Sequence, residues 1–221
     1  MLTSTTNGFT NKNSLIDKLP LENTRQAMIV KSTNITDMKI TFESYEKDDN
    51  NQWNLILSTN GVVGKNGMSP DRHEGDMTTP EGIFGFLFEF GIAPNPGTNM
   101  EYRQIHPNDY WSSVPSEEEY NTWVTYQGDP EERFGSDKYE ALYHIPLYKY
   151  GAALDFNYGS NKIIGKGTAI FFHIAPYSGG GTAGCVGIPE AELVEVLKWM
   201  TPEKNPKIII GTEDYLKSLR P

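Results

Sequence analysis

The chain has 221 residues, of which 37% are hydrophobic and 22% are charged, and its formal net charge is −10. These proportions are typical of a folded globular protein and exclude extensive disorder. The acidic balance argues against a nucleic-acid-binding surface and against attraction to anionic lipids or wall polymers, so an anionic ligand has to be held by local groups. No apolar run approaches the roughly 18 residues that a membrane span requires.

The N-terminal stretch, residues 1–24, is rich in Thr, Asn and Ser and has no hydrophobic periodicity. This composition predicts a polar arm or tether, and a remnant of expression sequence fits it equally well. Its start lacks the apolar core of a signal peptide. From residue 25 to residue 221 the pattern predicts one folded domain, because all-β domains of this length are often single.

Strands are predicted wherever apolar residues alternate with polar ones. The charged segment 46–51 lies between two such stretches and predicts a hairpin turn. The aromatic residues at every second position from Phe84 to Phe90 predict one core strand. Further predicted strands cover 27–30, 40–42, 53–57, 139–145, 154–158 and 207–211, and the glycine-rich stretch 61–68 predicts a strand that bends or passes close behind another backbone.

One principal helix is predicted from Pro189 to Met200. Proline suits the first helical position, Glu190 and Glu192 suit the positive end of the helix dipole, and an apolar stripe indicates a core-facing side. The pattern as a whole predicts a mainly β fold, either a β-sandwich or a curved mixed sheet, with this helix packed on it. A short tail is predicted after the last strand.

The segment 93–119 contains four prolines and weak periodicity, which is typical of a long functional loop. Aromatic side chains in and after it can line a groove for a sugar or a peptide, although ordinary loop packing explains any single one slightly better. These residues are Tyr102, Tyr110, Trp111, Tyr120, Trp123 and Tyr126.

One stretch combines the parts of a nucleophilic site. The apolar run 169–175 contains His173, a glycine-rich loop follows, and the only cysteine, Cys185, ends that loop before the predicted helix. A neighbouring imidazole or a field of backbone N–H groups converts a thiol to the reactive thiolate. A lone cysteine or histidine is more often a packing residue, but their conjunction in one strand–loop–helix segment favours catalysis.

The segment 182–186, Thr-Ala-Gly-Cys-Val, resembles the L,D-transpeptidase catalytic domain, also called the YkuD family. Residues 68–84, which contain Glu-Gly-Asp and Thr-Pro, resemble a second family stretch, and residues 165–173 resemble the family's approach to the histidine. A weaker match lies at 120–124. The resemblance extends roughly from residue 26 to residue 211.

This sequence departs from the family pattern at two positions of the motif. Many members carry a histidine where this chain has Ala183 and an arginine where it has Gly187. The chain therefore resembles a branch of the family in which this motif has the sequence TAGCV. These departures leave the substrate, and to a lesser extent the activity, open.

The resemblance implies a mechanism and a substrate. His173 is expected to accept the thiol proton, and Cys185 to attack a peptide carbonyl, while the backbone N–H groups of Cys185 and Gly184 hold the oxyanion. No orienting carboxylate for the histidine is evident, so a backbone carbonyl is expected to fix its tautomer. The implied substrate is a peptidoglycan stem tetrapeptide, cut after the L-centre of its third residue with release of D-Ala. An amine or water then takes the acyl group.

Further residues are expected to support this chemistry. The loop residues Gly181, Thr182, Ala183 and Gly184 are expected to shape the oxyanion site. The substrate-cleft candidates are Arg72, Glu74, Asp76 and Tyr158. His106 and His144 are interpreted as structural or solvated.

No metal or organic cofactor is implied, since the four histidines show no zinc-type spacing, and the single cysteine excludes an internal disulfide. The resemblance implies a cell-envelope or secreted location, with the leader absent from this sequence. The oligomeric state stays open. Two other functions also remain open: an inactive cell-wall-binding module of the same fold, and a thiol amidase or peptidase that acts on another acyl group.

Overall fold

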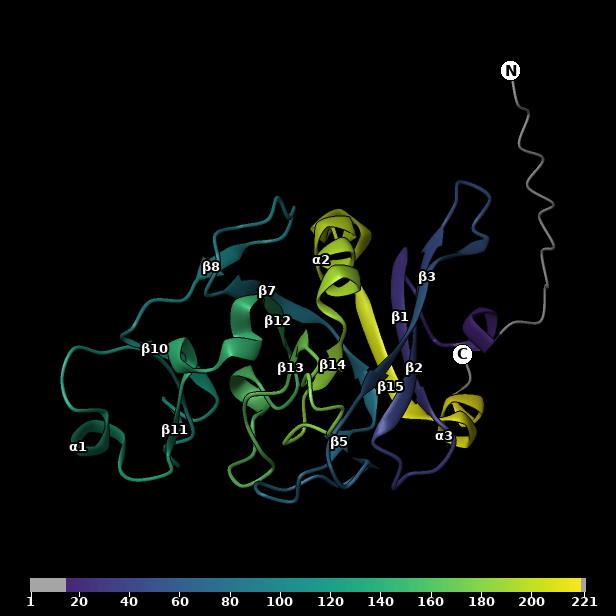
Figure 1. Ribbon diagram of the computed structural model, residues 1–221. Coiled ribbons are helices and arrows are strands. Elements are labelled where there is room, and N and C mark those ends of the chain that lie inside the picture. Colours follow the sequence, from purple (N-terminus) through teal and green to yellow (C-terminus); the bar gives the residue numbers. More distant parts are fainter. Residues whose placement is uncertain (1–14, 220–221) are drawn as a thin grey trace.

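The structure, a computed structural model, describes residues 15–219, which form one long curved sheet with three α-helices around it (Figure 1). Three neighbouring strand pairs of this sheet are parallel and the others antiparallel, so the sheet is mixed as predicted. In spatial order its strands are β6 (Gly82–Phe84), β15 (Lys207–Thr212), β1 (Gln26–Ser32), β2 (Lys39–Lys47), β3 (Trp53–Val62), β14 (Val186–Ile188), β13 (Phe171–Ile174), β12 (Gly151–Leu154), β7 (Phe86–Gly91) and β8 (Tyr102–Gln104).

The hairpin predicted around residues 46–51 is confirmed between β2 and β3. Asp48 closes its turn, since Oδ1 accepts hydrogen bonds from the backbone N–H groups of Asn50 and Gln52. Alternate residues of β2 are buried, Ile40 and Phe42 among them, as period-two patterning requires.

The single strand predicted from Phe84 to Phe90 is instead two strands, β6 and β7, which pair near opposite ends of the sheet. Gly85 separates them, and its N–H donates to Asp155 Oδ1 at 2.8 Å. Because one residue joins strands at the two ends, the sheet has to curl so that these ends approach each other. Phe84 therefore packs against the main core, whereas Phe88 and Phe90 belong to a second apolar cluster.

Three other predicted elements differ from the structure. The strand predicted at 139–145 is a short strand, β11 (Tyr139–Ala141), followed by the 3-10 turn η2 (Leu142–His144). The strand predicted at 154–158 lies earlier and ends at Leu154. The predicted C-terminal tail contains a helix, α3 (Glu213–Ser218), whose first turn is capped by the side chain of Thr212.

The principal helix, α2 (Glu190–Trp199), is confirmed, with Pro189 as its N-cap rather than its first helical residue. Its stripe Leu193, Val196 and Leu197 is fully or almost fully buried in the main core, together with residues from both halves of the sheet. The helix thus packs against strands on both sides of β13 and β14.

A second, three-stranded sheet projects beside the main sheet (Figure 1). It consists of β9 (Asp109–Ser112), β10 (Thr122–Thr125) and β11, and it is followed along the chain by η3 (Pro146–Lys149), while α1 (Pro130–Phe134) lies between β10 and β11. The aromatic residues considered for a groove mostly pack inside: Tyr110, Trp111 and Tyr120 are buried, and Trp123 packs edge-on against Phe88 and Phe90.

The first described residues pack against the folded domain. The 3-10 turn η1 (Leu15–Lys18) and the residues after it bury Ile16, Leu19 and Leu21 in a cluster with Leu216 of α3. Of the predicted arm 1–24, residues 1–14 lie outside the described residues. The remaining short elements are β4 (Met68–Ser69), β5 (Thr79–Pro80), η4 (Gly159–Asn161) and η5 (Pro202–Lys204). Within residues 15–219, no helix has the length and apolar character needed to cross a membrane.

Candidate active site

The predicted pair, His173 and Cys185, lies in one cavity of about 570 Å³. His173 is on β13, and Cys185 directly precedes β14, the parallel neighbour of β13. Both residues are buried, with exposed fractions of 3% and 7%. Parallel pairing at the centre of the sheet therefore brings together two residues that are 12 positions apart in the chain.

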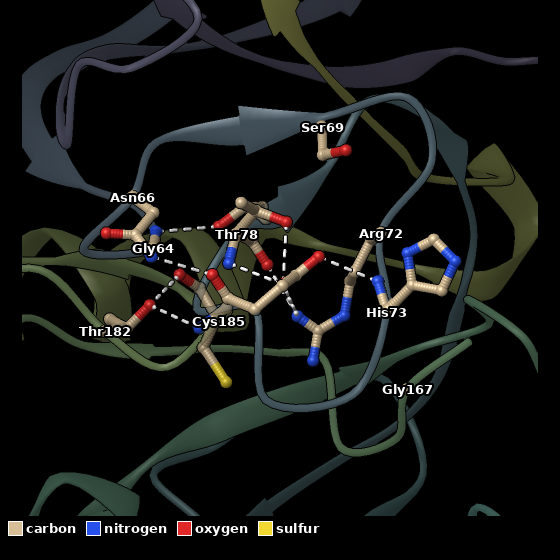
Figure 2. A network of polar contacts seen from close by, with 12 residues as sticks. Gly64, Asn66, Ser69, Arg72, His73, Thr78, Gly167, Thr182 and Cys185 are labelled. Atoms are coloured by element: carbon tan, nitrogen blue, oxygen red, sulfur yellow. Dashed lines mark hydrogen bonds and ion pairs between the residues drawn. The ribbon is translucent and has the colours of Figure 1, made fainter. Parts of the chain in front are cut away.

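Thr182 holds the loop that ends at Cys185. Its backbone pairs with the segment that follows β3, through hydrogen bonds with Val63 and Lys65. Its hydroxyl donates to the carbonyl of Cys185 at 2.6 Å and accepts from the N–H of Gly184 at 3.1 Å (Figure 2). The turn is thus rigid, and the N–H of Gly184 is already engaged in it.

Two glycines allow the close packing on either side of Cys185. Gly184 has φ 143°, and a Cβ there would lie 2.8 Å from the carbonyl oxygen of Thr78 and collide with the guanidinium of Arg72. At Gly187, a Cβ would lie 2.9 Å from the Cα of Ala175. The arginine that many family members carry at position 187 therefore has no room in this sheet without backbone movement.

The thiol of Cys185 is a neutral, hydrogen-bonded group in this cavity. Sγ donates to the carbonyl of Ala169 at 3.3 Å and accepts from the N–H of Phe171 at 3.4 Å. Burial and the negative charge of Glu140 raise the thiol pKa to about 12, against the opposing effects of the Phe171 N–H, the Arg72 charge and Tyr148. At neutral pH the thiol is therefore protonated.

The imidazole of His173 is neutral as well. Its Nδ1 lies 2.7 Å from the carbonyl oxygen of Ile174, so Nδ1–H is the donor and Nε2 carries the lone pair. A backbone carbonyl thus fixes the tautomer, as expected from the sequence. Burial lowers the pKa of the imidazole to about 4, although the hydrogen bond to Ile174 raises it.

Tyr148 and Glu140 complete the wall behind this pair, and the sequence analysis missed both. Tyr148 is a buried residue of η3 whose ring centroid lies 5.3 Å from that of His173. Its hydroxyl donates to Glu140 and also reaches the thiol of Cys185. Glu140 belongs to β11 and lines the cavity. Neither residue lies in a recognisable motif, so no signal in the sequence marked them.

Arg72 also lines the cavity, from the loop between β4 and β5 (Figure 2). Nη1 donates to the carbonyl of Thr78 at 2.5 Å and lies 3.7 Å from Asp76 Oδ1. Within residues 15–219 the buried Nε has no hydrogen-bond partner. Asp76 organises the same loop, since its carboxylate accepts from the N–H groups of His73 and Thr78.

The other predicted site residues fall into two groups. Glu74 is an exposed residue at the cavity, and Gly181, Thr182 and Ala183 line it as well. Asp76 and Tyr158 are not among its lining residues; Asp76 is half-buried in its own loop, and Tyr158 is exposed at the start of η4. His106 and His144 are exposed and do not line the cavity either.

No group of three or more His, Cys, Asp or Glu side chains in the described part of the chain is arranged to hold a metal ion. The lining of the cavity includes one buried thiol, one buried imidazole, a buried guanidinium and a half-buried carboxylate.

The model of the L,D-transpeptidase catalytic domain family, YkuD, matches residues 33–210. The chain belongs to this family. At the level of the family, membership indicates an L,D-transpeptidase-type role in peptidoglycan metabolism and a cell-envelope context. A comparison with curated proteins finds no match.

Two solved structures are similar to this chain, both of the helical cell shape determining protein Pgp2 from Campylobacter jejuni. A single-site mutant of Pgp2 has 17% identity and a TM-score of 0.47, over 92% of this chain and 52% of its own. The unmutated protein has 16% identity and a TM-score of 0.45, over 94% of this chain and 56% of its own. The chain thus spans about half the length of these proteins.

Proposed function

We propose that this protein catalyses cysteine-dependent acyl transfer on peptidoglycan stem peptides, with Cys185 as nucleophile and His173 as base. The observation that carries the proposal is the parallel pairing of β13 and β14, which places both side chains in one cavity. A thiol and an imidazole within one buried cavity are the arrangement that acyl transfer by a cysteine needs.

Because both groups are neutral at rest, attack and proton transfer are coupled. The thiol, which donates to the carbonyl of Ala169 at rest, turns to His173 Nε2, and this nitrogen takes its proton as Sγ attacks the peptide carbonyl carbon. A buried ion pair therefore forms only as the C–S bond forms. The proton then passes from the imidazolium to the departing amine, and the C–N bond breaks. The product is a thioester on Cys185 and a neutral imidazole.

The oxyanion of the tetrahedral intermediate needs a donor close to the nucleophile. The sequence suggested the N–H groups of Cys185 and Gly184, but the hydroxyl of Thr182 already accepts from Gly184. We therefore assign the oxyanion to the Cys185 N–H. Gly184 and Thr182 act through the shape of the turn that orients this donor.

The thioester is released by an amine, which gives a cross-link, or by water, which gives a shortened peptide. Transpeptidase and L,D-carboxypeptidase actions therefore share the first half of the reaction. The inactive wall-binding module and the thiol amidase predict different products, so the same experiment separates them.

Mass spectrometry after incubation with purified disaccharide-tetrapeptide tests the proposal. Wild-type protein is expected to release D-Ala and to form a cross-linked dimer or a tripeptide, while Cys185→Ala forms neither and carries no acyl adduct. Binding without any product or adduct in the wild type contradicts the proposal and supports the wall-binding module. A peptide cut at another acyl bond supports the amidase instead.

A further inference from the structure

The cavity around Cys185 is lined by a buried guanidinium and a half-buried carboxylate. Arg72, which is 7% exposed, lies against Gly184 on one side of the nucleophile. Glu140 lines the same cavity and accepts a hydrogen bond from Tyr148, whose ring contacts that of His173. Arg72 packs against Gly184, the residue before Cys185, and Glu140 accepts from the Tyr148 hydroxyl beside the thiol, so Glu140 raises the pKa of Cys185 and Arg72 lowers it. A substrate group next to the scissile bond thus enters a cavity that holds both a cation and a carboxylate.

Glu140 differs from the other carboxylates that line the cavity. Glu74 and Asp137 are exposed, so water screens their charges. Glu140 is half-buried, and its backbone is fixed by antiparallel pairing with Trp111 of β9. Its carboxylate is held by the hydrogen bond from Tyr148, whose hydroxyl also reaches the thiol of Cys185.

The hydrogen bond from Tyr148 does not neutralise this carboxylate. A phenol donates one proton to one oxygen and carries no charge, whereas a carboxylate has acceptor capacity for several donors. Burial raises the pKa of the Glu140 carboxyl, and the Tyr148 hydroxyl only partly opposes this effect. A carboxylate that loses hydration is stabilised by a cation that enters the same cavity.

We propose that Glu140 binds the ammonium group of the amine that accepts the acyl group from Cys185. This inference rests on the proposed function, and it names the second substrate of the same site as a primary amine that enters in its charged form. Water, the competing acceptor, has no charge for Glu140 to hold.

The acceptor step balances with the groups present. One proton of the ammonium passes to the Glu140 carboxylate, and the amine lone pair attacks the thioester carbonyl carbon. His173 takes a second proton from the new C–N centre as the C–S bond breaks, and it returns this proton to the departing thiolate. Glu140 then releases its proton to solvent. The net products are an amide, the free thiol and one proton.

Glu140→Gln tests the inference because it keeps the size of the side chain and removes the charge. With disaccharide-tetrapeptide, the ratio of cross-linked dimer to tripeptide should fall at least about tenfold. The ratio is the readout because both products come from the same acyl-enzyme, so a change in the rate of its formation, which removal of the charge beside the thiol can cause, cancels in it. Asp137→Asn, which removes an exposed charge at the same cavity, should keep the wild-type ratio. With hydroxylamine, which is uncharged at neutral pH, Glu140→Gln and wild type should form hydroxamate equally.

A measurement on wild type alone covers the case in which Glu140→Gln does not fold. An N-trimethylated analogue of the acceptor keeps the charge and cannot be acylated. It should suppress dimer formation while hydrolysis of the acyl-enzyme to tripeptide continues, so the ratio of dimer to tripeptide falls. If this analogue has no effect, or if Glu140→Gln keeps the wild-type ratio, the inference is overturned while acyl transfer stands. If wild type forms no acyl-enzyme at all, the proposed function fails first and the inference with it.

Discussion

The two sides of the cavity come from different kinds of sequence. His173 lies on β13 and Cys185 directly precedes the neighbouring strand β14, both inside stretches that resemble family motifs. Glu140 and Tyr148 come from the region of the three-stranded sheet and from η3, where no motif marks them. The two groups differ in their proposed tasks. Cys185 and His173 supply the nucleophile and its base, whereas Glu140 and Tyr148 affect the pKa of the thiol.

His173→Gln tests the motif side and should have the largest effect on activity. Glutamine keeps a polar side chain of similar reach but has no basic nitrogen, so the thiol proton has no acceptor of suitable pKa. We expect kcat/KM for D-Ala release to fall roughly 10²- to 10⁴-fold. His144→Gln, an exposed histidine outside the cavity, should match wild type. A His173→Gln variant that retains more than a tenth of the activity would assign the base elsewhere.

Asn121→Leu tests the contact between the two sides and should have the largest effect on stability. The buried amide accepts from Trp111 Nε1 and from the N–H of Ala169, and it donates to the carbonyls of Phe156 and Asn157. Asn121 also has φ 59°, which asparagine tolerates better than leucine. We expect a loss of about 3–5 kcal/mol in the free energy of unfolding, measured in urea.

The control for this variant is Asn99→Ala, which removes one exposed hydrogen bond to the carbonyl of Lys198 and should cost less than about 1 kcal/mol.

Ala169 also supplies the carbonyl that accepts from the thiol. Asn121→Leu should therefore change the rate at which iodoacetamide alkylates Cys185, even at temperatures where the protein stays folded. An unchanged alkylation rate would show that the two sides of the cavity are not coupled through this amide.

Tyr148→Phe tests the wall without motifs and should have a smaller effect. The ring contacts with His173 and Phe171 remain, but the hydroxyl no longer interacts with Glu140 and Cys185. One hydrogen bond is worth about 1 kcal/mol, so D-Ala release should slow roughly threefold to tenfold. Because the hydroxyl lowers the thiol pKa, alkylation of Cys185 at a fixed pH should slow as well.

The matched control for Tyr148→Phe is Tyr143→Phe, since Tyr143 is 40% exposed and does not line the cavity. A purely structural role of the Tyr148 hydroxyl would change the melting temperature and leave the pH dependence of alkylation as in wild type. Equal alkylation profiles for the wild type and Tyr148→Phe would therefore remove Tyr148 from the site chemistry.

Local patterns predicted the parts of the fold that depend on local chemistry. The β2–β3 hairpin follows from alternation and a charged turn, and α2 follows from its apolar stripe and acidic first turn. The division of 84–90 into two strands was not predictable, because period two is the same whichever strand is the partner. Glu140 and Tyr148 were missed for a related reason: their hydrogen bond and their contact with the thiol arise from tertiary packing. The motif side was accessible because its residues are close together in the chain.

The surroundings of the cavity set the charge states of His173 and Cys185. Burial lowers the pKa of His173 to about 4 and raises that of Cys185 to about 12, so the neutral pair dominates between these values. As pH falls through about 4, the imidazole gains a proton and ceases to be a base; as pH rises, the thiol stays protonated up to about 12. The kcat/KM for D-Ala release should therefore be level from about pH 5.5 to about pH 9.5.

A resting imidazolium–thiolate pair would give a different pH profile. Its population depends on both pKa values, so kcat/KM would rise and fall with pH within this range. The pH dependence of the free energy of unfolding is an independent test. The pKa of His173 is lower in the folded protein than its ordinary value of 6.5, so the unfolded chain binds the proton more tightly. The free energy of unfolding should accordingly fall as pH drops from about 6.5 toward 4, and His173→Gln should remove that part of the slope. If kcat/KM is level but the pH dependence of the free energy of unfolding does not change in His173→Gln, the neutral base is another residue. If kcat/KM follows a bell-shaped curve centred near neutral pH, the thiolate forms before the substrate binds.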